Sequence, residues 1–82
     1  MKKVWCGNMP TICGYGLMVY GKSYEEASRL LKRQFYILRE RYKLDQNMHS
    51  EFYTYDKAMD WFDGRVFEIK FGVRYDECNR EF

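Results

Sequence analysis

Apolar and polar residues alternate along most of the segment from Arg65 to Tyr75. One side of this segment would carry the apolar series Phe67, Ile69, Phe71, Val73 and Tyr75. Glu68, Lys70 and Arg74 fall on the other side. A period of two with one polar face predicts a half-buried antiparallel strand over 65–75, and Gly72 within it indicates a bulge or a close backbone approach.

The period becomes helical between residues 23 and 42. One stripe contains Ala27, Leu31, Phe35, Leu38 and Tyr42, with Tyr24 beside it. This spacing places the apolar side chains on one face of a helix. Ser23, followed by Glu26 three residues later, forms a capping-box pattern, so we expect the helix to begin at this serine.

The same junction recurs later in the chain. Residues 18–27 and 49–58 both contain a capping hydroxyl, then a tyrosine, an acid and an alanine. We therefore expect strands over 2–6, 12–20, 51–55 and 65–75, and helices over 23–42 and 56–62. This order, β-β-α-β-α-β, predicts an α+β domain: a small, mainly antiparallel sheet with the long helix packed on one face.

The expected core lies between that helix and the last strand. Its predicted members are Leu31, Phe35, Leu38, Phe67, Ile69 and Phe71. A chain of 82 residues is short enough to form one domain, residues 1–82. Its content of 46% apolar and 20% aromatic residues provides enough apolar surface for folding. No apolar run approaches the roughly 20 residues that span a bilayer, and the first ten residues lack a signal-peptide pattern. A cytoplasmic protein without a membrane contact is expected.

Charge divides the chain into two halves. Residues 1–43 carry nine Lys/Arg and three Glu, a net charge of +6, whereas residues 44–82 carry five Lys/Arg and nine acids, a net charge of −4. Opposite the apolar stripe, the long helix would expose Arg29, Lys32, Arg33, Arg39 and Lys43, with Tyr36 among them. Cations and an aromatic on one face favour nucleic-acid binding as an alternative function, although Glu25 and Glu40 interrupt the face.

Residues 6–16, CGNMPTICGYG, combine two cysteines, three glycines and a proline. Phosphate-binding glycine loops lead into a helix, whereas this stretch leads into the apolar run LMVY. Zinc accepts a set such as Cys6, Cys13, Cys78 and His49, but their spacing lacks the close ligand pairs of structural zinc sites. We therefore expect a hairpin connection with reduced thiols, and no metal.

Catalytic groupings are sparse. The acids Asp56, Asp60 and Asp63 fit helix-start and surface positions, and nothing places the single histidine beside a thiol. We expect neither enzymatic activity nor a cofactor.

Eight tyrosines are more than a core of this size hides easily, because each buried hydroxyl needs a partner. Tyrosine and tryptophan concentrate at protein interfaces, so a protein partner is the favoured expectation. The candidate binding residues lie off the apolar stripe or at element ends: Tyr15, Tyr20, Tyr36, Tyr53 and Tyr55. A homodimer is also compatible with the sequence.

The small size, the strand-rich opening GYGLMVYGKSYEEA and the helix after it resemble, in overall profile, phage-encoded inhibitors of the anti-CRISPR type. None of these features is a diagnostic motif, so no residue roles are transferred. The resemblance implies inhibition of a host protein by occupation of its surface. A bacterial regulatory accessory protein is the other reading of the same residues.

Overall fold

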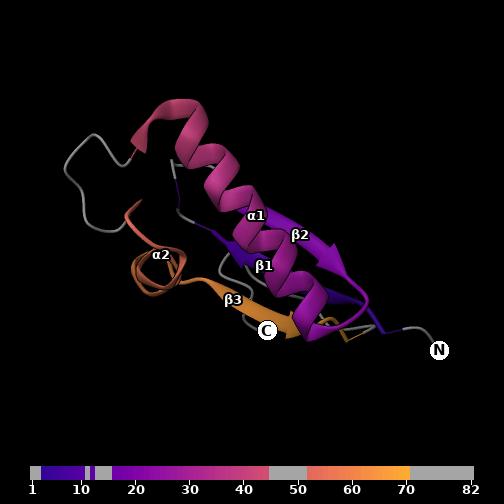
Figure 1. Cartoon of the computed structure of the whole chain (residues 1–82). Coiled ribbons are helices and arrows are strands. Elements are labelled where there is room, and N and C mark those ends of the chain that lie inside the picture. The colour runs from indigo at the N-terminus through magenta and orange to yellow at the C-terminus, as the bar shows by residue number, and fades with distance from the viewer. Residues whose placement is uncertain (1–2, 11, 13–15, 45–51, 71–82) are drawn as a thin grey trace.

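The computed structural model describes residues 3–10, 12, 16–44 and 52–70 (Figure 1). Its elements, in chain order, are β1 (Trp5–Met9), β2 (Leu17–Gly21), α1 (Tyr24–Tyr42), α2 (Tyr55–Trp61) and β3 (Arg65–Glu68). The three strands form one antiparallel sheet in the order β2-β1-β3. In Figure 1 the long helix α1 lies across the sheet, and α2 leads into β3. The predicted α+β class is confirmed.

The glycine-rich stretch near the start is only partly a hairpin connection, because residues 6–9 belong to β1 and the connection to β2 follows them. β1 ends at Met9 and β2 begins at Leu17, and these two residues are register partners. Gly16 has φ 78°, a left-handed conformation that suits glycine, and its N–H donates a 2.9 Å hydrogen bond to the carbonyl of Ile12. Ile12 is fully buried, so this connection also contributes to the core.

α1 begins and ends where local chemistry predicts. The hydroxyl of the N-cap, Ser23, accepts a 3.1 Å hydrogen bond from the N–H of Glu26. The Glu26 carboxylate accepts in turn from the N–H of Lys22, at 3.0 Å, one residue earlier than in a standard capping box. At the other end Lys43 adopts the left-handed conformation and its N–H bonds to the carbonyl of Arg39. The predicted helix over 23–42 is confirmed.

The core lies between α1 and the sheet face that carries Gly7 and its register partners Val19 and Val66. A Cβ on Gly7 would lie 3.1 to 3.2 Å from Val19, from the carbonyl oxygen of Ala27 and from Leu31. The missing side chain therefore allows α1 to approach β1 closely. The buried cluster consists of Met9, Ile12, Leu31, Phe35, Ala58 and Phe62.

The predicted core is right for the helix and wrong for the last strand. Leu31 and Phe35 are fully buried, and Leu38 packs against them. On β3, however, Val66 contacts the cluster, whereas Phe67 pairs with Cys6 and so lies on the sheet face away from α1. Neither Phe67 nor Ile69 is among the described residues that pack against the cluster, and Phe71 lies outside those residues.

The second sheet face explains this difference. Cys6 and Asn8 lie on the face away from α1, and both are buried, with exposed fractions of 2% and 4%. Both faces of β1 are therefore shielded from solvent. Alternation defines which residues share a face but not which face meets the helix, so Phe67 of β3 can belong to the second face.

The strand predicted over 51–55 is wrong for residues 52–55, and residue 51 lies outside the description. Thr54 is instead the N-cap of α2, and its hydroxyl accepts a 3.2 Å hydrogen bond from the N–H of Lys57. Tyr55 is the first residue of the helix, and Asp56 follows in the first turn, where a negative charge is favourable. These helix-start interactions outweigh the strand preference of the two flanking tyrosines.

Other boundaries differ modestly from expectation. The first strand runs from Trp5 to Met9 rather than over 2–6, and the second begins at Leu17 rather than at residue 12. Of the strand predicted over 65–75, residues 65–68 form β3, and residues 71–75 lie outside the description. Within the described ranges, neither helix has the length and apolar character required to cross a bilayer.

Candidate protein-binding surface

Arg39 and Tyr36 join α1 to the start of α2. The Arg39 guanidinium lies 4.7 Å from the centroid of the Tyr36 ring, and its Nη1 donates a 2.9 Å hydrogen bond to the main-chain carbonyl of Tyr53. The Tyr36 hydroxyl accepts a 3.3 Å hydrogen bond from the N–H of Tyr55. A cation stacked on a ring and two hydrogen bonds therefore fix the position of α2 relative to α1.

This junction removes two of the predicted tyrosines from the free surface. Tyr36 and Tyr55 both pack against the buried cluster, and the Tyr55 ring lies 6.3 Å from that of Phe35. Burial raises the pKa of Tyr55 to about 12, with smaller electrostatic contributions from Tyr24 and Asp56. Both candidates are therefore only partly exposed.

Two exposed aromatics lie beside the junction, Tyr53 just before the second helix and Trp61 at its end. Tyr53 and Trp61 have exposed fractions of 46% and 67%. The Lys57 ammonium lies 5.7 Å from the centroid of the Tyr53 ring, and Trp61 follows Lys57 by four residues, on the same side of α2. We refer to Tyr53, Lys57 and Trp61 as the α2 aromatic patch.

Trp61 was not among the residues selected from the sequence. Ala58 is fully buried, and Phe62, four residues later, completes the inward side of this turn, where its ring lies 5.5 Å from that of Phe52. Trp61 therefore faces outward. The signal was present in the sequence, because two adjacent bulky residues at the end of a short helix cannot both point into the core.

Tyr20 is exposed, as expected, but it lies elsewhere. It is the register partner of Cys6, so its side chain lies on the sheet face away from α1, and its hydroxyl donates a 3.1 Å hydrogen bond to the sulfur of Met18. Tyr15 lies outside the described residues. The sequence-selected tyrosines thus do not form one surface.

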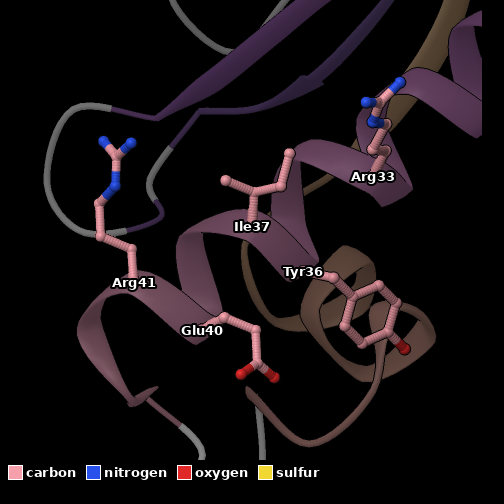
Figure 2. A pocket seen from close by; sticks show the side chains of 5 residues that line it. All are labelled: Arg33, Tyr36, Ile37, Glu40 and Arg41. Atoms are coloured by element: carbon pink, nitrogen blue, oxygen red, sulfur yellow. The ribbon is translucent and has the colours of Figure 1, made fainter.

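A shallow groove of about 590 Å³ lies on the outer side of α1. Its lining residues are Arg33, Tyr36, Ile37, Glu40 and Arg41, which we call the α1 groove. A smaller hollow of about 190 Å³ shares Ile37 and Arg41 and extends to Leu17 of β2. Figure 2 shows Arg33, Ile37 and Arg41 extending to one side of the helix, with Tyr36 turned toward α2 and Glu40 pointing away.

The cations predicted for nucleic-acid binding divide into two groups. Four of them are exposed: Arg29, Lys32, Arg33 and Lys43. Arg39 differs, because only 19% of its side chain is exposed and its Nη2 lies 3.6 Å from the Glu40 carboxylate, in addition to the contacts with Tyr36 and Tyr53. Ile37 and Arg41 were not selected from the sequence. Ile37 had a detectable signal, since it is an apolar residue off the apolar stripe of its helix.

The metal hypothesis depends on residues that the structure does not place. Cys6 is a buried free thiol, and burial raises its pKa above the ordinary value. Cys13, His49 and Cys78 lie outside the description. Within the described part of the chain, no three histidine, cysteine or acidic side chains are grouped as metal ligands.

The chain was compared with protein-family models, with curated proteins and with solved structures, and none of the three comparisons gave a match.

Proposed function

We propose that this protein is a non-enzymatic protein-binding module that contacts its partner through the α2 aromatic patch. The observation that supports the proposal most directly is the position of Trp61, which is 67% exposed at the end of a helix whose inward side is already filled by Ala58 and Phe62. Fold stability does not require a large aromatic at this outward position. Tryptophan and tyrosine are enriched among the residues that dominate protein interfaces.

The contacts that hold the Tyr53 segment in place also favour binding. Association costs free energy when side chains and loops become ordered, and a surface already held in place avoids part of that cost. Arg39 bonds to the carbonyl of Tyr53, and Lys57 lies against the Tyr53 ring. The chain that carries Tyr53 is therefore positioned before a partner arrives.

The proposal is tested by capture from a cell lysate with immobilised protein, followed by quantitative mass spectrometry. Trp61→Ala and Tyr53→Ala should lose the captured protein, whereas Tyr42→Ala, which truncates a tyrosine of similar exposure outside the patch, should retain it. With the purified partner, Trp61→Ala should weaken binding by about 2 kcal/mol or more, roughly 30-fold. Unchanged capture by both patch variants, with an intact fold, would contradict the proposal.

Nucleic-acid binding is the second candidate, supported by the exposed cations Arg29, Lys32, Arg33 and Lys43. It predicts a steep loss of affinity with salt and similar effects of each exposed cation. Arg39 should not share this behaviour, because its guanidinium is engaged with Tyr36 and Tyr53. Binding of random single-stranded oligonucleotides at 50 and 200 mM salt would distinguish the two candidates.

Inhibition of a host protein, as the phage-inhibitor resemblance implies, and regulation of a bacterial assembly are both outcomes of surface binding. Both remain predictions, and they differ in the kind of protein that the chain would bind. Identification of the captured protein separates them, because an inhibitor should reduce its partner's activity when added in purified form.

A further inference from the structure

Two arginines flank an exposed apolar side chain in the α1 groove. Arg33, Ile37 and Arg41 are spaced four residues apart, and Ile37 has an exposed fraction of 42%. With a rise of 1.5 Å per residue, the two arginine positions are about 12 Å apart along α1, with Ile37 midway. Figure 2 shows the three side chains on the same side of the helix.

These two arginines have no partner within the described part of the chain. The ion pair of α1 is formed by Arg39 and Glu40, and no hydrogen bond or ion pair joins Arg33 or Arg41 to another described residue. Arg39 of the same helix differs from them. Its guanidinium contacts the Tyr36 ring, the carbonyl of Tyr53 and the carboxylate of Glu40. Arg33 and Arg41 together have ten guanidinium donor sites, five on each, and none of these donors is bonded to another described residue.

We infer that the α1 groove is a docking site for an acidic amphipathic helix of a protein partner. The partner helix would place an apolar side chain against Ile37, with Asp or Glu four residues before and four residues after it. Two helices have the same rise per residue, so carboxylates at this spacing meet Arg33 and Arg41 at the same time. Guanidinium groups bind carboxylates through charge-assisted and often bidentate hydrogen bonds.

The charges of the groove-lining residues favour an acidic ligand. Glu40 is the only acid among the groove-lining residues; it is ion-paired with Arg39 and points away from the two arginines. A nucleic-acid strand would also satisfy two cations, but its phosphates make no use of an apolar residue between them. The exposed Ile37 at the centre therefore favours an amphipathic peptide, in which apolar contact supplies affinity and the flanking charges supply register.

This docking site is separate from the α2 aromatic patch and does not depend on it. Tyr36, which lines the groove, turns toward α2, whereas Arg33, Ile37 and Arg41 project from the other side of α1. Trp61→Ala should therefore leave peptide binding in the groove unchanged. Loss of binding at one of these two surfaces can therefore be detected while the other surface still binds its ligand.

The probe is a fluorescent, terminally blocked 15-residue helical peptide of alanine with a central leucine and glutamates four residues before and after it. Fluorescence anisotropy should show binding that weakens about tenfold when both glutamates are replaced by glutamine. Arg33→Gln and Arg41→Gln should each weaken binding about threefold to tenfold, and Ile37→Ala about tenfold. Lys32→Gln is the matched control, because Lys32 is an exposed cation of α1 that does not line the groove.

Three results would overturn the inference. The first is equal binding of the glutamate and glutamine peptides, or no binding of either at millimolar concentration. The second is an equal effect of Lys32→Gln and Arg33→Gln, which would mean general attraction to a basic helix. The third is displacement of the peptide by a 20-nucleotide single strand that binds more tightly and loses affinity steeply with salt, which would assign the groove to nucleic acid.

Discussion

Arg39 of α1 donates a 2.9 Å hydrogen bond to the main-chain carbonyl of Tyr53, two residues before α2 begins. The two residues are 14 positions apart, and the segment between the helices includes residues outside the description. The bond therefore links α1 directly to the chain that carries an exposed tyrosine. An arginine that looks like part of a solvent-exposed basic face is instead a connection between two helices.

Replacement of Arg39 by glutamine should lower the free energy of unfolding by about 1–3 kcal/mol, because a charge-assisted hydrogen bond and a cation–π contact are lost together. Urea denaturation measures the change. Arg33→Gln is the matched control, since Arg33 is exposed and has no described partner, and it should stay within about 0.5 kcal/mol of the wild type. Equal effects of the two substitutions would mean that the Arg39 contacts do not stabilise the fold.

The orientation of β3 gives a second test. Phe35→Ala should destabilise the protein by about 3–5 kcal/mol, because Phe35 is fully buried in the cluster between helix and sheet. Phe67→Ala should have a smaller effect, since Phe67 is only partly buried and lies on the opposite sheet face. The two variants can be compared in one denaturation series. A larger loss for Phe67→Ala would indicate that β3 presents its other side to α1.

Local patterns in the sequence were sufficient to predict α1 and the first hairpin. The Ser23 cap and the stripe through Ala27, Leu31 and Phe35 depend on contacts between neighbouring turns, and the structure contains them. A connection between two paired strands was also predicted correctly, although residues 6–9 of the glycine-rich stretch belong to β1. Interactions of this kind lie within a few residues along the chain, so the sequence carries them directly.

Long-range relationships were harder to predict. Alternation along residues 65–75 identified two sets of residues, but the choice between them in β3 depends on the pairing of Val66 with Gly7, a residue nearly sixty positions away. Tyr36 and Tyr55 were expected on the surface because nothing local shows that the start of α2 packs against α1. The same limit applies to Arg39, whose carbonyl partner belongs to Tyr53.

Tyr55 provides a third test, through pH. Burial is the main cause that raises the pKa of its hydroxyl to about 12 in the folded protein, and electrostatic interactions with Tyr24 and Asp56 add to it, whereas an unfolded chain has the ordinary value of about 10. Between these two values the unfolded state releases a proton that the folded state keeps. Rising pH therefore favours the unfolded state, so the contribution of Tyr55 is complete below about pH 10 and is lost progressively as pH rises toward 12.

Tyr55→Phe removes this titration while it keeps the ring that packs against Phe35. From pH 10 to 12 the free energy of unfolding should therefore fall more steeply in the wild type than in Tyr55→Phe, because every other titrating group is common to both proteins. Urea denaturation at pH 9, 10, 11 and 12 measures the two slopes. Absorbance near 295 nm, which follows tyrosinate formation, should show the late-titrating tyrosine only in the wild type. Parallel stability curves, with no late tyrosine in the wild-type titration, would place the Tyr55 hydroxyl in solvent and would contradict its packing against the core.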